Sequence, residues 1–184
     1  MNIMHDGKRA LQIRLREIVK DWNRKDRSFP SHSELESFGK MLLKWKRAEK
    51  IKGLWDDSPL MVSTTLDDGL GQGLRIINLF SEIAGLSVMP IGLLQPPEKI
   101  IAVCNKNFPD ILGLTVLQFD SEEMIIKIRR GIDPNITIIA GGPVFSADSE
   151  FAERTGINFV AKNVASFLEY LLGIAGSDQR AMAF

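Results

Sequence analysis

The chain has few of the residues that many catalytic and metal sites need. It has one cysteine and two histidines, and both histidines, His5 and His32, precede residue 58. One cysteine cannot form an internal disulfide or a cysteine-based zinc site, and it fits a reducing compartment. Because residues 58–184 contain no histidine, they cannot assemble a Ser–His–Asp triad by themselves. We expect no catalytic residues of these classes and no metal ligands.

A surplus of charge and long apolar runs are also missing. Lysine plus arginine and aspartate plus glutamate number 23 each, so the composition gives no general affinity for polyanions. No apolar run reaches the roughly 18 to 20 residues of a membrane span, and the first residues lack the apolar core of a secretory signal. Of the 184 residues, 45% are apolar and 25% charged, as in ordinary globular proteins. We expect a cytoplasmic protein with one hydrophobic core and no membrane partner.

The neutral total hides two regions of opposite charge. Residues 1–57 carry 14 Lys/Arg against 9 Asp/Glu, and residues 58–184 carry 9 against 14. The change coincides with a turn-rich stretch at 53–59. We expect a helical N-terminal module over 1–57, an α/β domain over 58–173 and a flexible tail over 174–184. The basic cluster at 44–52 is interrupted by glutamate and is typical of a solvated helix face, so nucleic acid is not expected as a partner.

Two amphipathic helices are predicted in the first region. Their apolar residues recur at helical spacing, and the pattern breaks at 27–30. Ser31 with Glu34 three residues later has the pattern of a capping box. Two short helices bury little alone, so their stripes must face each other, the main domain or a partner chain, and a homodimer through these helices is one possibility. The first stripe is Leu11, Leu15, Ile18, Val19 and Trp22, and the second is Leu35, Phe38, Leu42 and Trp45.

From residue 60 onward, strands and helices alternate. The expected strands, at 60–65, 86–91, 111–116, 135–140 and 157–160, are near-continuous apolar runs typical of strands buried on both faces. Helices are expected at about 71–84, 96–107, 120–131, 147–155 and 163–173. Strand and helix in regular alternation predict a five-stranded parallel sheet with helices on both faces.

Ligands of such sheets bind outside the carboxyl ends of the strands. Small or polar loops follow three of the expected strands, at 66–73, 115–119 and 141–145. Turn geometry alone also accounts for glycine in such loops. The first loop lacks the glycine at 74 that a dinucleotide fingerprint requires. The pair Asp67–Asp68 is similar to the acidic site of phospho-receiver domains, but Thr115 stands where a receiver has its acceptor aspartate.

Taken together, the three loops resemble the cobalamin-binding domain of corrinoid proteins and of cobalamin-dependent methyltransferases and mutases. That family has D-x-H-x-x-G after its first strand, S/T-x-L after its third and G-G after its fourth. The corresponding stretches here are 68–73 (DGLGQG), 115–117 (TVL) and 141–142 (GG). The resemblance covers about residues 60–173 and implies a flavodoxin-like fold.

The resemblance also implies a site. The family's histidine replaces the cofactor's own base as lower ligand of cobalt, its aspartate orients that histidine, and the detached tail enters a slot between the sheet and its helices. Here the ligand position is Leu70, which has no lone pair, and Asp68 is left to cap the next helix or to accept from backbone amides. The implied cofactor-binding residues are Asp68, Gly69, Leu70, Gly71, Gln72, Gly73, Thr115, Leu117, Gln118, Gly141, Gly142 and Phe145.

Three interpretations of Leu70 stay open. In the first, cobalamin binds base-off without a histidine ligand. In the second, a distant histidine of this chain or of a partner supplies the ligand. In the third, the fold has lost the cofactor. The first predicts a non-catalytic carrier or accessory protein for methyl transfer by a partner methyltransferase or radical enzyme. The third predicts an interaction or sensory module, and a DNA-linked regulator is a further class. The aromatic residues Trp22, Phe38, Trp45 and Trp55 then either cover the corrin or pack between the helices and the sheet domain.

Overall fold

The N-terminal region forms two helices, as the sequence predicts. The computed structural model describes residues 3–26 and 28–181. Helix α1 spans Ile3–Trp22 and helix α2 spans His32–Ala48. The Ser31 hydroxyl accepts from the Glu34 amide, and the Glu34 carboxylate accepts from the Ser31 amide at 2.8 Å. This confirms the capping box, and it fixes the start of α2 at His32.

The remaining chain forms a five-stranded parallel sheet with helices on both faces. The strands are β1 (Leu60–Thr65), β2 (Ser87–Pro90), β3 (Ile111–Thr115), β4 (Thr137–Gly141) and β5 (Phe159–Val160). Their order is β2-β1-β3-β4-β5, and every neighbouring pair is parallel. This is the flavodoxin-like order, so the predicted fold class is confirmed.

The helices between the strands match the predicted pattern with two differences. They are α3 (Gln72–Ala84), α4 (Pro97–Asn107), the 3-10 turn η1 (Phe119–Ser121), α5 (Glu122–Gly131), α6 (Val144–Ala147), α7 (Phe151–Thr155) and α8 (Val164–Ala181). The single helix expected at 147–155 is two short ones, because extended Asp148 ends α6 and its carboxylate accepts from the Glu150 amide. Helix α8 continues past residue 173, since Leu171 and Ala175 remain buried in the core.

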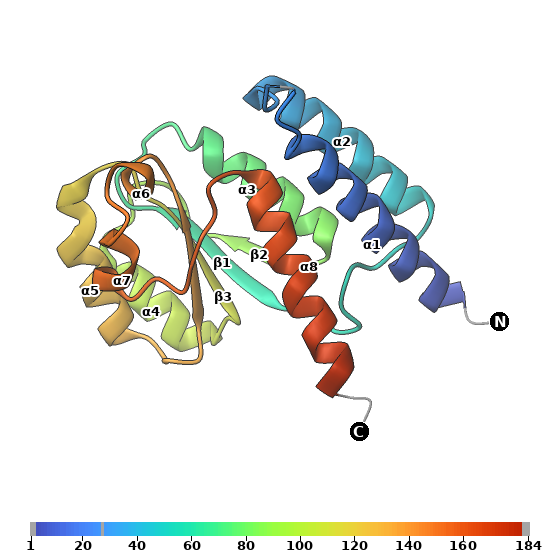
Figure 1. Cartoon of the computed structure of the whole chain (residues 1–184). Helices are drawn as coiled ribbons and strands as arrows, with labels where there is room; N and C mark the ends of the chain where they lie inside the picture. Colours follow the sequence, from blue (N-terminus) through green and yellow to red (C-terminus); the bar gives the residue numbers. More distant parts are fainter. Residues whose placement is uncertain (1–2, 27, 182–184) are drawn as a thin grey trace.

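Alternate strand residues supply two apolar layers, because side chains of a strand point to opposite faces. On β1, Met61 packs in the layer with Phe80 of α3 and Phe167 of α8. The next residue, Val62, packs in the opposite layer with Ile100 of α4 and Ile125 of α5. Figure 1 shows α4 and α5 on one side of the sheet, and α3 and α8 on the other with α1 and α2 outside them.

The two N-terminal helices belong to the same core as the sheet domain. Leu15 of α1 and Leu42 of α2 are fully buried in the cluster that contains Met61 and Phe80. The Trp22 ring meets the Phe80 ring edge-on with 5.6 Å between centroids. Of the orientations left open for the apolar stripes, the structure has them face the main domain, and Trp55 is buried in the same cluster. No helix within 3–26 and 28–181 is long and apolar enough to cross a bilayer.

Candidate functional site

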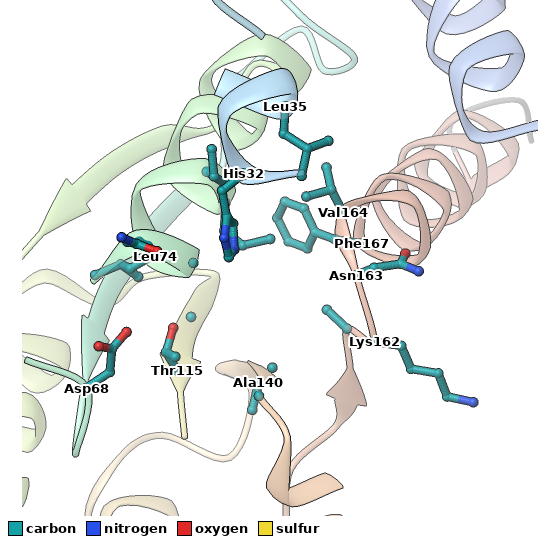
Figure 2. Close-up of a pocket in the computed structure, with 18 of the residues that line it drawn as sticks. His32, Leu35, Asp68, Leu74, Thr115, Ala140, Lys162, Asn163, Val164 and Phe167 are labelled. Atoms are coloured by element: carbon teal, nitrogen blue, oxygen red, sulfur yellow. The ribbon is translucent and has the colours of Figure 1, made fainter. Parts of the chain in front are cut away.

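A cavity of about 550 Å³ opens at the carboxyl ends of β1, β3 and β4. It lies on the sheet face that carries α3 and α8, where Met61, Gly113 and Ile139 line its floor. Leu74 of α3 and Phe167 of α8 line its two sides (Figure 2). Its size falls in the range of roughly 300–1,000 Å³ usual for small-molecule sites. The cavity therefore fits a bulky, largely apolar group.

The cavity exists because glycines stand where side chains would fill it. A Cβ at Gly73, in the first turn of α3, would meet no heavy atom within 4 Å. Gly113, in the middle of β3, leaves the floor flat between its neighbours Ser63 on β1 and Ile139 on β4. The open space beside Gly73 is thus available to a ligand without any rearrangement of the chain.

Two strand residues carry hydroxyl groups in or near the cavity: Ser63 is fully buried and does not line it, and Thr115 is half-buried and does. The Ser63 hydroxyl is fully buried and has no hydrogen-bond partner among the described residues. Thr115, at the end of β3, lines the cavity and its hydroxyl makes no hydrogen bond within residues 3–26 and 28–181. Because an unpaired buried polar group costs roughly 1–3 kcal/mol, such groups favour a bound ligand or water.

Asp68 shapes the loop that follows β1. Its carboxylate accepts from the amide of Leu70 at 2.8 Å and from the amide of Gly71 at 3.0 Å. The Thr65 hydroxyl donates to the Asp68 carbonyl at 2.6 Å and accepts from the Leu94 amide at 2.9 Å. Asp68 therefore has one of the roles expected for it, the acceptor of backbone amides, and the helix cap itself is Gly71.

Asp67 joins this loop to the one after β3. Its carboxylate accepts from the amides of Leu117 and Gln118, at 2.8 and 2.9 Å, and from the Ser121 hydroxyl at 2.7 Å. Both aspartates of the acidic pair are thus engaged by backbone groups and a serine. In the described part of the chain, no three His, Cys, Asp or Glu side chains gather closely enough to hold a metal ion.

The paired glycines after β4 have different roles. Gly142 has φ +140°, and a Cβ there would lie 1.8 Å from the Val116 carbonyl oxygen. Any side chain at 142 would collide with the backbone, so this glycine is required by the fold itself. Gly141 lines the cavity, and a Cβ there would come within 3.0 Å of the Ala161 carbonyl.

Exposed apolar side chains lie at the opening and in the loops near it. Leu70 is 73% exposed and Leu117 is 38% exposed, and both line the cavity. Leu94 and Phe119, in the loops after β2 and β3, are exposed as well. Leu94 has φ +52°, a conformation that costs a leucine roughly 1–2 kcal/mol. The strained backbone at Leu94 and the exposed apolar rim are both typical of a binding surface.

The structure brings most of the predicted site residues together. Those that line the cavity are Asp68, Leu70, Gln72, Gly73, Thr115, Leu117, Gly141 and Gly142. Gly69, Gly71, Gln118 and Phe145 are not among the cavity's lining residues. Phe145 meets the Phe151 ring edge-on, with 5.6 Å between centroids, in the layer on the opposite face of the sheet.

Other lining residues were not predicted from the sequence. Phe29, His32 and Leu35, at the start of α2, line the cavity, and so does Lys162 after β5. Nothing in the local pattern around residue 32 predicts this, because the contact depends on how α2 packs across α3 and α8. The capping box at Ser31 predicts where the helix begins, but it does not predict which elements the helix packs against.

Cys104 lies far from this chemistry, on α4 at the opposite face of the sheet. It is fully buried, as expected for a small apolar residue. Burial raises the pKa of its thiol to about 11. The thiol is therefore protonated at neutral pH and is no nucleophile.

Comparison with known proteins gives a family and a set of structural neighbours. The family model described as B12 binding domain matches residues 59–165. No curated protein matches the chain. A novel cobalamin-binding protein from Desulfitobacterium hafniense DCB-2 superposes with a TM-score of 0.76 at 17% identity, over 91% of this chain and 82% of that one.

Two structures from Methanosarcina barkeri are also similar. The methanol:cobalamin methyltransferase complex MtaBC matches with a TM-score of 0.63 at 15% identity, over 95% of this chain and 68% of that one. The monomethylamine corrinoid protein matches with a TM-score of 0.61 at 15% identity, over 77% of this chain and 65% of that one. At these identities the likeness concerns the fold.

Proposed function

Because the chain belongs to the B12-binding domain family, we propose that it is a corrinoid carrier that holds cobalamin base-off, without a histidine ligand to cobalt. The cofactor's nucleotide tail would occupy the cavity between α3 and α8. The observation that carries this proposal is the cavity itself, which is apolar at its floor, open beside Gly73 and placed at the carboxyl ends of the strands.

The polar groups of the cavity suit a nucleotide tail. Thr115 stands where its hydroxyl can hydrogen-bond a group that enters between α3 and α8. Gln72 at the start of α3 and Asn163 before α8 also line the cavity, so polar side chains flank an apolar floor. An aromatic base with polar edges, attached to a ribose and a phosphate, matches this distribution of groups.

The rim around the opening suits the flat corrin ring. Leu70 and Leu117 present apolar side chains to solvent at the edge of the sheet, and their burial beneath a macrocycle is favourable at roughly 25 cal/mol per Å². Leu70 has no lone pair to bind cobalt, and its apolar side chain would disfavour water next to the metal. Bound cobalamin would supply a cobalt centre that accepts and gives up a methyl group.

A partner protein would complete the function. The polar side chains that line the cavity, among them Thr115, Gln72 and Asn163, suit the binding of a cofactor. Two structural neighbours are a corrinoid protein and a methyltransferase complex. We therefore propose a carrier or accessory protein that serves a methyltransferase or a radical enzyme. The same fold used without cofactor, as an interaction module, is the alternative.

The test is anaerobic loading with hydroxocobalamin and with methylcobalamin, followed by desalting and an absorption spectrum. We expect about one corrinoid per chain to stay bound, with the spectrum of the base-off form. Loss of both corrinoids on desalting would contradict the proposal and favour the cofactor-free module.

A further inference from the structure

The outer side of the cavity is closed by the N-terminal region rather than by the sheet domain. Phe29, His32 and Leu35 line it there, across from the sheet. Figure 2 shows the His32 side chain leaving α2 toward the space between Leu74 of α3 and Phe167 of α8. The N-terminal region thus forms one more side of the cavity. These residues lie outside 59–165, the range that matches the B12-binding family model.

This side of the cavity is firmly anchored. The Lys46 ammonium donates to the Glu82 carbonyl at 2.6 Å, and Arg47 pairs with the Glu82 carboxylate at 2.6 Å. Leu35 is buried in the core, and the capping box at Ser31 fixes the first turn of α2. Buried Leu35 and the capping box hold the first turn of α2, which carries His32, at the cavity.

The imidazole of His32 is free to bind a ligand. His32 is exposed to solvent while it lines the cavity, and no hydrogen bond or ion pair joins its imidazole to any residue that the structure describes. A neutral imidazole offers one N–H donor and one nitrogen acceptor. His32 enters from α2, whereas Leu70 belongs to the loop after β1, where its amide donates to the Asp68 carboxylate. If the corrin ring lies over Leu70, His32 would face the nucleotide tail in the cavity and not the cobalt.

We propose that the start of α2 is part of the corrinoid site and that His32 hydrogen-bonds the nucleotide tail. This inference rests on the proposed function, since the tail is the occupant. It gives the N-terminal helices a role in choosing the cofactor: they select corrinoids that carry a nucleotide tail over those that lack one.

The first test observes the imidazole directly. In protein with ¹⁵N-labelled histidine only two imidazoles contribute, those of His5 and His32, and a His32→Phe variant assigns them. We expect the His32 signals to shift on saturation with hydroxocobalamin and to stay in place with cobinamide, which has no nucleotide tail. His32 signals unmoved by saturating hydroxocobalamin would overturn the inference. A bond from His32 to cobalt would overturn it too. Such a bond would be seen as the loss of the free imidazole nitrogen of His32 together with the loss of the base-off absorption spectrum of the cofactor.

The second test measures affinity. We expect His32→Trp, which fills the cavity, to weaken hydroxocobalamin about tenfold or more, and cobinamide less than about twofold. Ser33→Trp is the matched control, because Ser33 is the next residue of α2 and does not line the cavity. His32→Ala, which removes only the imidazole, should weaken hydroxocobalamin about three- to tenfold.

The two failures are distinguishable. If the wild-type protein loses hydroxocobalamin on desalting, the proposed function itself is wrong, and if it binds hydroxocobalamin and cobinamide equally, the placement of the tail in the cavity is wrong. If the wild-type protein prefers hydroxocobalamin while the His32 variants behave like Ser33→Trp, only the inference about α2 is wrong. Thermal unfolding of each variant verifies that the fold is intact.

Discussion

At the scale of single residues, the proposed base-off binding depends on Leu70, which would leave the cobalt of a bound corrinoid without a side-chain ligand. Its side chain is exposed at the opening, and its amide is held by the Asp68 carboxylate, so the position is well defined although it offers no ligand. Both residues were singled out in the sequence by the resemblance of 68–73 to the family's D-x-H-x-x-G motif. The sequence left open what Asp68 does without a histidine, since that depends on amides placed by the folded loop.

The Leu70→His variant is expected to supply an imidazole nitrogen as a ligand to cobalt. The change adds an imidazole at the rim, next to an aspartate carboxylate, while the exposed position tolerates the replacement with a stability change within about 0.5 kcal/mol. In the hydroxocobalamin-loaded variant, the absorption spectrum should move from the base-off to the nitrogen-ligated form. A base-off spectrum in a loaded variant would contradict the placement of this loop beneath the ring. Leu70→Met, which adds no nitrogen, is the control.

At the scale of elements, the site depends on how α3 and α8 sit above the strand ends. The sequence predicted the strands to within two residues, because buried apolar runs and turn residues are local signals. It could not place Phe145, since residue order does not say which layer a short helix after β4 faces. It also missed the start of α2, because its contact with the cavity is set by packing between elements far apart in the chain.

Gly73 of α3 offers the cleanest probe of the cavity. Gly142 does not, because its side-chain position collides with the backbone and any replacement disturbs the fold. Gly73→Leu projects into open space and replaces a poor helix former with a good one, so the free energy of unfolding should stay level or rise by up to about 1 kcal/mol.

The same Gly73→Leu change should abolish retention of hydroxocobalamin on desalting, because the leucine would occupy the space in which we place the nucleotide tail of the cofactor. Ligand retention and denaturant unfolding measure the two effects separately. Gly173→Leu is the matched control, since that glycine lies on α8 and a Cβ there also meets nothing within 4 Å, but it does not line the cavity. Full retention by Gly73→Leu would place the tail elsewhere.

At the scale of the whole molecule, one core spans both parts of the chain. The charge change at 53–59 predicted separate regions, yet Leu15 and Leu42 are buried with residues of α3 and α8. The charge pattern reflects which residues lie at the surface, whereas the shared core depends on contacts between segments that are distant in the sequence. The molecule therefore couples the helical pair to the cofactor domain.

Leu15→Ala tests this coupling. Removing a fully buried leucine should cost roughly 2–5 kcal/mol. We expect a single denaturant transition, shifted as a whole, when the tryptophans, all in the N-terminal region, and the far-ultraviolet circular dichroism are followed together. Two separate transitions would mean that residues 1–57 fold independently of the sheet domain. Ile13→Ala, at an exposed position of α1, is the control.

The central claim is that the chain holds a corrinoid with neither its own base nor a protein histidine on cobalt. The most direct measurement is the electron paramagnetic resonance spectrum of the protein loaded with Co(II) cobalamin and desalted anaerobically. The unpaired electron of Co(II) lies along the axial direction, so an axial ¹⁴N splits each cobalt line into three. We predict cobalt lines without this splitting. Threefold splitting in the loaded wild-type protein would show a nitrogen on cobalt and contradict the account.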